Sequence, residues 1–230
     1  MHRSRDLRGL ALAGVLALAA WSLVPGAPAS AQPLSLGEQF ALRSYTGAAM
    51  GQVLTGISKA ERVGVLTNPT SICGSLVGAM GAQVVSTSKA PDAFAVAALA
   101  KPEDAAPAVA AFKDRNAVAL IFGGQMSPEE NYALTKAALR ALAEADYKGA
   151  LFLHLRIWVP KFAEKAAAED PVIGKYLAAK QNVYTVTVDV PNGKALVHRV
   201  SFAEPAQRSV EVLHQVVMNP TWLDLFKRSI

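Results

Sequence analysis

Four short apolar runs alternate with longer segments that carry helix signals, and this alternation restricts the fold more than any other feature. The runs are Val63–Leu66, Ala93–Leu99, Val118–Phe122 and Gly149–Ile157. Each has a length typical of a buried strand, and the intervening segments are long enough for helices. Strands that alternate with helices form parallel pairs joined by right-handed crossovers. We therefore predict an α/β fold, a three-layer domain with a mostly parallel sheet of about four strands.

The strongest helix start signal follows the third run. Ser127 can cap a helix, Pro128 takes the first helical position, and Glu130 completes a capping box three residues after the serine. This pattern predicts a helix over residues 127–147. A proline followed by two acidic residues likewise predicts a helix over residues 102–116, because carboxylates suit the positive end of a helix.

The C-terminal third has a different pattern. Polar and apolar residues alternate on both sides of Asn192 and Gly193, a pair typical of a two-residue turn. We therefore predict a β-hairpin over residues 183–202 with one face exposed to solvent. Helices are expected to follow at residues 206–218 and 220–228.

The first residues predict export. Three arginines precede the stretch 9–24, which is apolar except for one serine, and residues 29–31 read Ala-Ser-Ala, a suitable cleavage site. The stretch is shorter than the about 20 residues that a membrane span needs, which favours cleavage over a retained anchor. We therefore predict a signal peptide at residues 1–31 and a periplasmic or secreted mature protein.

Removing 31 of the 230 residues leaves 199, which suits a single domain with a sizeable core. We expect an N-terminal helical segment at residues 32–60 and a single α/β domain at 61–230. The mature chain has 20 basic and 17 acidic residues, and a net charge of +3 is too small to indicate a nucleic-acid partner. After cleavage we expect a protein that is not integral to the membrane.

The single cysteine, Cys73, excludes an internal disulfide. It lies near a predicted helix start, where the thiolate form is favoured, but a nucleophile also needs a base. His154 could approach it, although no spacing requires that, and a free cysteine is more often a small buried residue. An enzyme that uses Cys73 is therefore a third and less favoured hypothesis, and the sequence designates no catalytic residue. It also lacks metal-ligand spacings and nucleotide-binding loops, so we expect no metal and no cofactor.

Ligands of open parallel α/β sheets bind outside the carboxyl ends of the strands, so the residues that follow those ends are the candidates for binding. The candidate ligand-binding residues are Thr67, Asn68, Thr70, Ser71, Gly124, Gln125, Ser127, Arg156 and Trp158. Their hydroxyls, amides, helix-start N–H groups, cation and aromatic ring would suit a small polar or anionic ligand. The alternative is that Asn68, Ser71 and Ser127 only cap helices and that Trp158 belongs to the core.

Three segments resemble one lobe of an ABC transporter periplasmic substrate-binding protein. They are residues 61–69, which read Glu-Arg-Val-Gly-Val-Leu-Thr-Asn-Pro, residues 103–112 and residues 118–123. The strand and turn of the first segment are similar to those that open a lobe in an uncharacterised type of this family. The resemblance covers about residues 61–157.

This resemblance implies ligand contacts in the loops 67–71 and 123–127. The family has two lobes that close on the ligand, which need about 280 residues or more, whereas the mature chain has length for one. The resemblance therefore implies an exported small-molecule-binding or accessory protein, similar to a single lobe of a transporter's solute-binding protein.

An interaction module without a small ligand is the alternative. Either the region 34–58 or the C-terminal helices would then dock a membrane-embedded envelope partner. The residues that could form such a docking face are Trp222, Leu223, Leu225 and Phe226. Core packing would explain the same four residues equally well.

Overall fold

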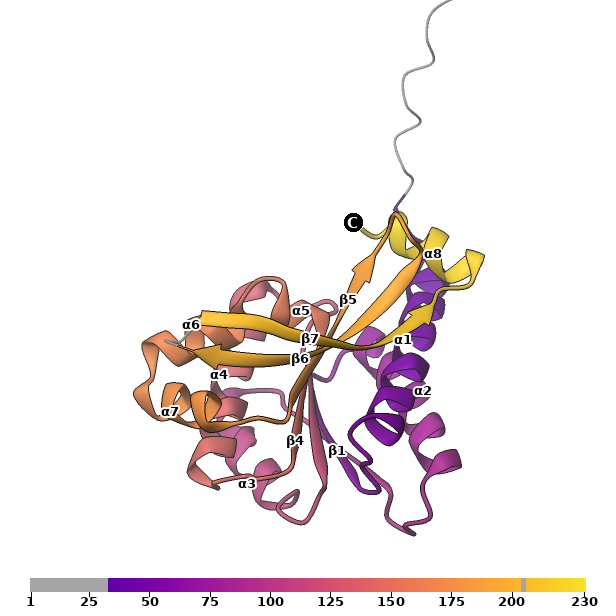
Figure 1. Cartoon of the computed structure of the whole chain (residues 1–230). Coiled ribbons are helices and arrows are strands. Elements are labelled where there is room, and N and C mark those ends of the chain that lie inside the picture. Colours follow the sequence, from indigo (N-terminus) through magenta and orange to yellow (C-terminus); the bar gives the residue numbers. More distant parts are fainter. Residues whose placement is uncertain (1–32, 204–205) are drawn as a thin grey trace, which may run out of the picture. The chain divides into compact units, whose positions relative to one another are not determined.

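The computed structural model describes residues 33–203 and 206–230, so the predicted signal peptide lies outside the described residues. They form a seven-stranded sheet with the strand order β2-β1-β3-β4-β5-β6-β7 (Figure 1). The strands are β1 (Val63–Thr67), β2 (Phe94–Ala98), β3 (Ala117–Ile121), β4 (Ala150–Leu153), β5 (Val183–Asp189), β6 (Lys194–Ala203) and β7 (Ala206–Val217). Neighbours from β2 to β5 pair in parallel, and β6 and β7 add antiparallel pairs.

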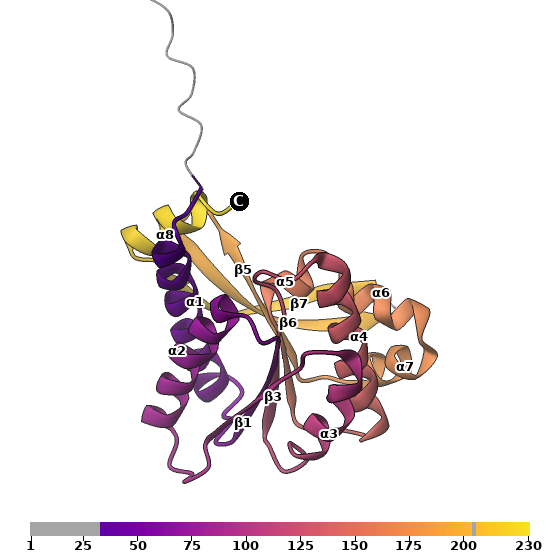
Figure 2. The same cartoon turned by 180° about the vertical axis from the view of Figure 1, so that it is seen from behind.

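Helices cover both faces of the parallel strands, which confirms the predicted three-layer α/β class (Figures 1 and 2). One face is covered by α1 and α2, and the other by α3, α4, α6 and α7. The helices are α1 (Leu36–Gly56), α2 (Ser71–Thr87), α3 (Ala105–Ala110), α4 (Pro128–Glu144), α5 (Leu155–Trp158), α6 (Phe162–Glu169), α7 (Pro171–Ala179) and α8 (Pro220–Lys227), with a short 3-10 helix at Pro102–Asp104. Within the described part of the chain, none of these helices has the length and apolar character needed to cross a bilayer.

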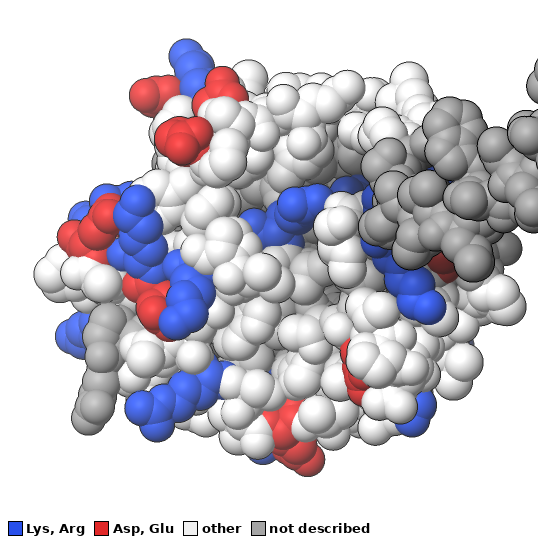
Figure 3. Space-filling model, turned by 90° about the horizontal axis from the view of Figure 1, so that it is seen from above, with Lys and Arg blue, Asp and Glu red and all other residues white. Residues whose placement is uncertain are grey.

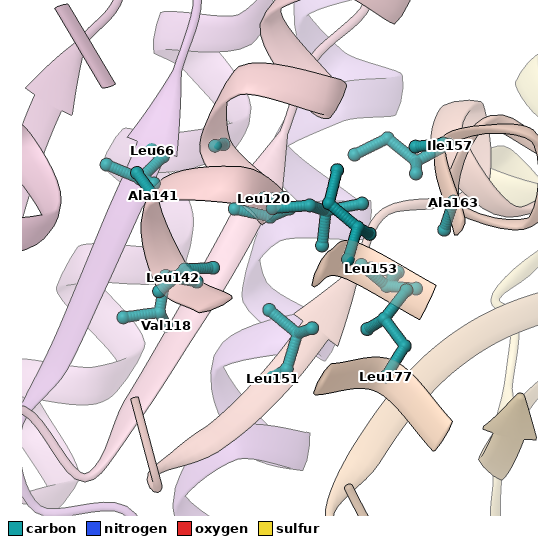
Figure 4. Packing of buried hydrophobic residues seen from close by; sticks show 14 of the residues in the cluster. Leu66, Val118, Leu120, Ala141, Leu142, Leu151, Leu153, Ile157, Ala163 and Leu177 are labelled. Carbon is teal, nitrogen blue, oxygen red and sulfur yellow. The ribbon is translucent and has the colours of Figure 1, made fainter. Parts of the chain in front are cut away.

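The central strands are buried on both faces, as their continuous apolar runs predict. All five residues of β1 and all five of β3 are buried. Alternate side chains contribute to two separate core clusters, one on each side of the sheet. Figure 4 shows part of one cluster, in which Leu120 and Leu153 from the sheet lie toward Ile157 and Ala163.

The prediction of a helix at residues 206–218 is wrong, because this segment is the strand β7. It contains alternating β-branched residues such as Val210 and Val212, and it pairs with β6 along its whole length. Two irregularities in the register accompany the pairing, and each places an extra residue on β7. Pairing with β6 therefore decided between a helix and a strand, which the residues of this segment alone do not distinguish.

Three smaller predictions also need correction. The parallel part of the sheet has five strands instead of about four, because β5 pairs with β4 in parallel before it forms the hairpin with β6. The hairpin is confirmed, but its loop spans residues 190–193, since Asp189 lies opposite Lys194. The fourth strand ends at Leu153, four residues earlier than predicted, because His154 caps the short helix α5.

Candidate functional site

The strand order reverses between β1 and β3, and this reversal opens a crevice at their carboxyl ends. Asn68 ties together the loops that follow the two strands. Its Nδ2 donates to the carbonyl oxygen of Gly123 at 2.6 Å and to Oδ1 of Asn131 at 3.0 Å, and its Oδ1 accepts from Thr70 Oγ1 at 2.8 Å. The two predicted loops therefore do converge, through a buried amide that is 1% exposed.

Glycines allow the β3 loop to pack closely in this crevice. Gly124 has φ +69°, a left-handed conformation that a side chain rarely adopts. A Cβ at this position would lie 2.5 Å from Thr70 Oγ1. At Gly123 a Cβ would lie 3.3 Å from Cγ of Arg156. The loop is therefore held between the start of α2 and the side chain of Arg156.

A cavity of about 560 Å³ adjoins this loop at the carboxyl edge of the sheet. Its walls come from α1, the β3 loop, the start of α4, the α5–α6 region, β5 and the C-terminal segment. Figure 3, a view from above, shows Lys and Arg side chains in a hollow whose surroundings are largely uncharged. The cavity thus combines positive charge with mostly apolar walls.

Two arginines line this cavity, Arg43 from α1 and Arg156 from α5. Among the residues that the structure describes, neither guanidinium forms an ion pair with a carboxylate. Burial and the nearby charge of Arg156 lower the pKa of Arg43 below its usual range. An arginine stays protonated in proteins, so the cavity carries two positive charges, one on the partly buried Arg43 and one on the exposed Arg156.

Other arginines of the described chain do find carboxylates. Those with an ion pair are Arg62, Arg115, Arg140, Arg199 and Arg228. Arg208 also forms no ion pair within the described residues, but it is exposed to solvent, whereas Arg43 is partly buried.

Two further titratable groups lie close to the arginines, and neither supplies negative charge. Burial, followed by the charges of Arg43 and Arg156, lowers the pKa of His154 to about 3, so its imidazole is neutral. Its Nδ1 accepts a hydrogen bond from the backbone N–H of Arg156 at 3.4 Å. Burial raises the pKa of the Cys73 thiol, which keeps it protonated. The surroundings of Cys73 thus oppose the thiolate that a nucleophile would require.

Several predicted site residues surround the crevice. Asn68, Thr70, Gly124 and Arg156 are connected by the contacts described above. Thr67 is buried beside them, and its Oγ1 donates to the carbonyl oxygen of Ile121 at 2.9 Å. Of the nine candidates, Gly124 and Arg156 line the cavity itself.

The other candidates have different surroundings. Ser71 and Gln125 are exposed to solvent. Ser127 forms the predicted capping box, since its Oγ accepts from the N–H of Glu130 at 3.2 Å. Trp158 packs against the main core, with its ring edge-on to Phe202 at a centroid distance of 6.3 Å. Helix capping and core packing therefore account for Ser127 and Trp158.

Sequence reasoning missed Arg43, the second arginine of the cavity. The expectation that ligands bind at the carboxyl ends of the strands considers only residues that follow strands, whereas Arg43 lies inside the helix α1. Its position in the cavity depends on how α1 packs, and one arginine within a helix carries no local signal of that. Val188 of β5 also lines the cavity and was not a candidate, and Phe226 was predicted only as part of the alternative docking face.

Comparisons with known proteins give a matching family model and distant structural likenesses. A family model described as "Uncharacterized protein" matches residues 39–225. No curated protein matches the sequence. Among solved structures, the substrate-binding protein LivJ of a branched-chain amino acid transporter from Streptococcus pneumoniae, in complex with isoleucine, is similar with a TM-score of 0.44 and 14% identity. The match covers 63% of this chain and 36% of that one, so the chain spans about a third of that protein, and the likeness supports no statement about function.

Proposed function

The chain belongs to the family of uncharacterized proteins whose model matches residues 39–225, and starting from its own geometry we propose that it binds a small anionic ligand. The binding site is the cavity at the carboxyl edge of the sheet. The observation that carries the proposal is the pair Arg43 and Arg156, which line one cavity without a carboxylate partner among the described residues.

The size and position of the cavity support this function. Its volume of about 560 Å³ lies in the range of small-molecule sites. It adjoins the strand-order reversal, where open α/β sheets bind ligands.

The proposed setting is the periplasm or the extracellular space, with the ligand presented to an envelope system. The signal-like residues 1–31 support export. In this proposal the described part of the chain acts like a single lobe of a transporter's solute-binding protein, without closure of a second lobe. In a two-lobed solute-binding protein the second lobe forms one side of the binding site. Here α1 and the C-terminal segment would form that side.

The residues of the alternative docking face are largely buried within the protein. Trp222 and Leu225 are 6% and 5% exposed and pack in a cluster with Leu42 of α1. Leu223 and Phe226 are only partly buried, and Phe226 lines the cavity. No observation favours an interaction module strongly enough to make it a second candidate function.

Native mass spectrometry tests the proposal on the protein purified gently from a periplasmic extract of cells that express the full chain. We expect a bound small molecule that is lost in Arg156→Met and retained in Arg62→Met, whose arginine pairs with Asp92 outside the cavity. A bare protein that instead captures a neighbouring envelope protein would contradict ligand binding and support the interaction module.

A further inference from the structure

We infer that the ligand is an amphiphilic anion with one carboxylate or phosphate head group and an apolar body. This inference rests on the proposed function and specifies the chemistry of its ligand. It follows from two properties of the cavity walls, namely the two guanidinium groups that form no ion pair within the described residues and the extent of apolar surface.

The head group follows from the two arginines. A guanidinium presents its N–H donors in a planar fork that matches carboxylate and phosphate oxygens, and such charge-assisted hydrogen bonds are strong in partly buried sites. Arg43 and Arg156 are close enough for each other's charge to influence the pKa of Arg43. One anionic head group between them would neutralise the repulsion that the ligand-free cavity contains.

The apolar body follows from the remaining wall. Apolar residues from four different segments line the cavity: Leu155, Val159, Phe162, Val188 and Phe226. Val159 is 65% exposed, which is high for a large aliphatic side chain beside a cavity. An inorganic anion would leave this surface in contact with water, whereas an alkyl or aromatic body would cover it and gain hydrophobic free energy.

A matched pair of ligands tests this inference by isothermal titration calorimetry on the protein recovered from cells that express the full chain. The probes are octanoate and 1-octanol, which share the apolar body and differ in the charged head group, together with inorganic phosphate as an anion without an apolar body. We expect octanoate to bind at least about tenfold more tightly than either of the other two, because only octanoate satisfies both parts of the cavity.

Variants identify the site in the same experiment. Arg156→Met is expected to weaken octanoate binding at least about tenfold, and Arg62→Met to leave it unchanged, because Arg62 pairs with Asp92 on the surface. Equal or tighter binding of 1-octanol would overturn the inference.

Two further outcomes separate the inference from the proposed function. If phosphate binds and octanoate does not, the inference of an amphiphilic ligand is wrong, but the proposed anion-binding site is retained. Failure of all three probes, or binding that does not change in Arg156→Met, would count against both.

Discussion

The two ends of the parallel strands each hold a cavity with a buried or partly buried cation, but they differ in how the protein surrounds that charge. At the amino end, a cavity of about 670 Å³ is lined by Tyr147, Tyr176 and Lys180. Lys180 Nζ donates to the carbonyl oxygen of Tyr147 at 3.0 Å and lies 5.3 Å and 5.2 Å from the centres of the Tyr147 and Tyr176 rings. Burial lowers the pKa of Lys180 to about 8, so its amine is still mainly protonated at neutral pH.

The carboxyl end holds its cations without such compensation. Arg43 and Arg156 lack a carboxylate partner in the part of the chain that the structure describes, and each is near the other's charge. A carbonyl and two aromatic faces give Lys180 a structural explanation that the arginines lack. A partly buried charge without a carboxylate partner, such as that of Arg43, reduces the stability of the fold, so this comparison favours a ligand-binding role for the carboxyl end.

The largest expected effect concerns the buried amide that organises the carboxyl end. Asn68→Ala should lower the free energy of unfolding by about 3 kcal/mol, because the Gly123 carbonyl, Asn131 and Thr70 lose buried hydrogen-bond partners. Urea denaturation measures the change. Gln52→Ala, at an exposed position of α1, is the control and should stay within about 0.5 kcal/mol. A loss below about 1 kcal/mol would show that Asn68 does not organise the crevice.

A pH-dependent effect should follow from His154. Its folded-state pKa of about 3 lies below the usual value of 6.5, so below pH 6.5 the unfolded chain binds a proton that the folded chain does not. Stability from this group is therefore lost as the pH falls from 6.5 toward 3, by about 2 kcal/mol at pH 4.5. His154→Asn retains a capping residue but cannot titrate, so its stability should fall less over this range.

Denaturant titrations of the wild type and His154→Asn between pH 7 and pH 4.5 measure this difference. Carboxylates contribute equally to both curves, so the comparison isolates the histidine. Parallel curves would contradict a buried neutral imidazole beside the two arginines.

A smaller effect is expected at the glycine of the β3 loop. Gly124→Ala should destabilise the protein by about 1.5 kcal/mol, because the position has φ +69° and a Cβ would lie 2.5 Å from Thr70 Oγ1. Gly78→Ala is the matched control, since it lies within α2 with nothing within 4 Å of the added Cβ. It should stabilise the protein by up to about 1 kcal/mol. Thermal denaturation that shows the same sign for both variants would refute this account of the loop.

The smallest effect tests the comparison of the two ends directly. Arg43→Met should raise the stability of the ligand-free protein by about 1 kcal/mol, because it removes a partly buried charge that Arg156 repels. Lys180→Met should give no such gain, since it also removes a hydrogen bond to Tyr147 and two aromatic contacts. Chemical denaturation at pH 7 compares them. A gain in Lys180→Met as large as in Arg43→Met would remove the distinction between the two ends.

The sequence by itself determined the elements whose signals are local. The buried strands β1 and β3 follow from continuous apolar runs, and the start of α4 follows from Ser127, Pro128 and Glu130. These signals lie within a few consecutive residues, so they do not depend on the rest of the chain. Together with the right-handed rule for crossovers, they were sufficient to predict the three-layer α/β class, whereas the convergence of the loops after β1 and β3 is seen only in the structure.

Tertiary structure alone decided the features that depend on distant partners. Pairing with β6 made residues 206–217 a strand, and packing against Phe202 placed Trp158 in the core and outside the cavity. Packing of α1 brought Arg43 to the same cavity as Arg156, although 112 positions separate them in the sequence. The physical reason is that strand pairing, burial and the meeting of two charges are properties of surfaces in contact, and no window of consecutive residues contains both surfaces.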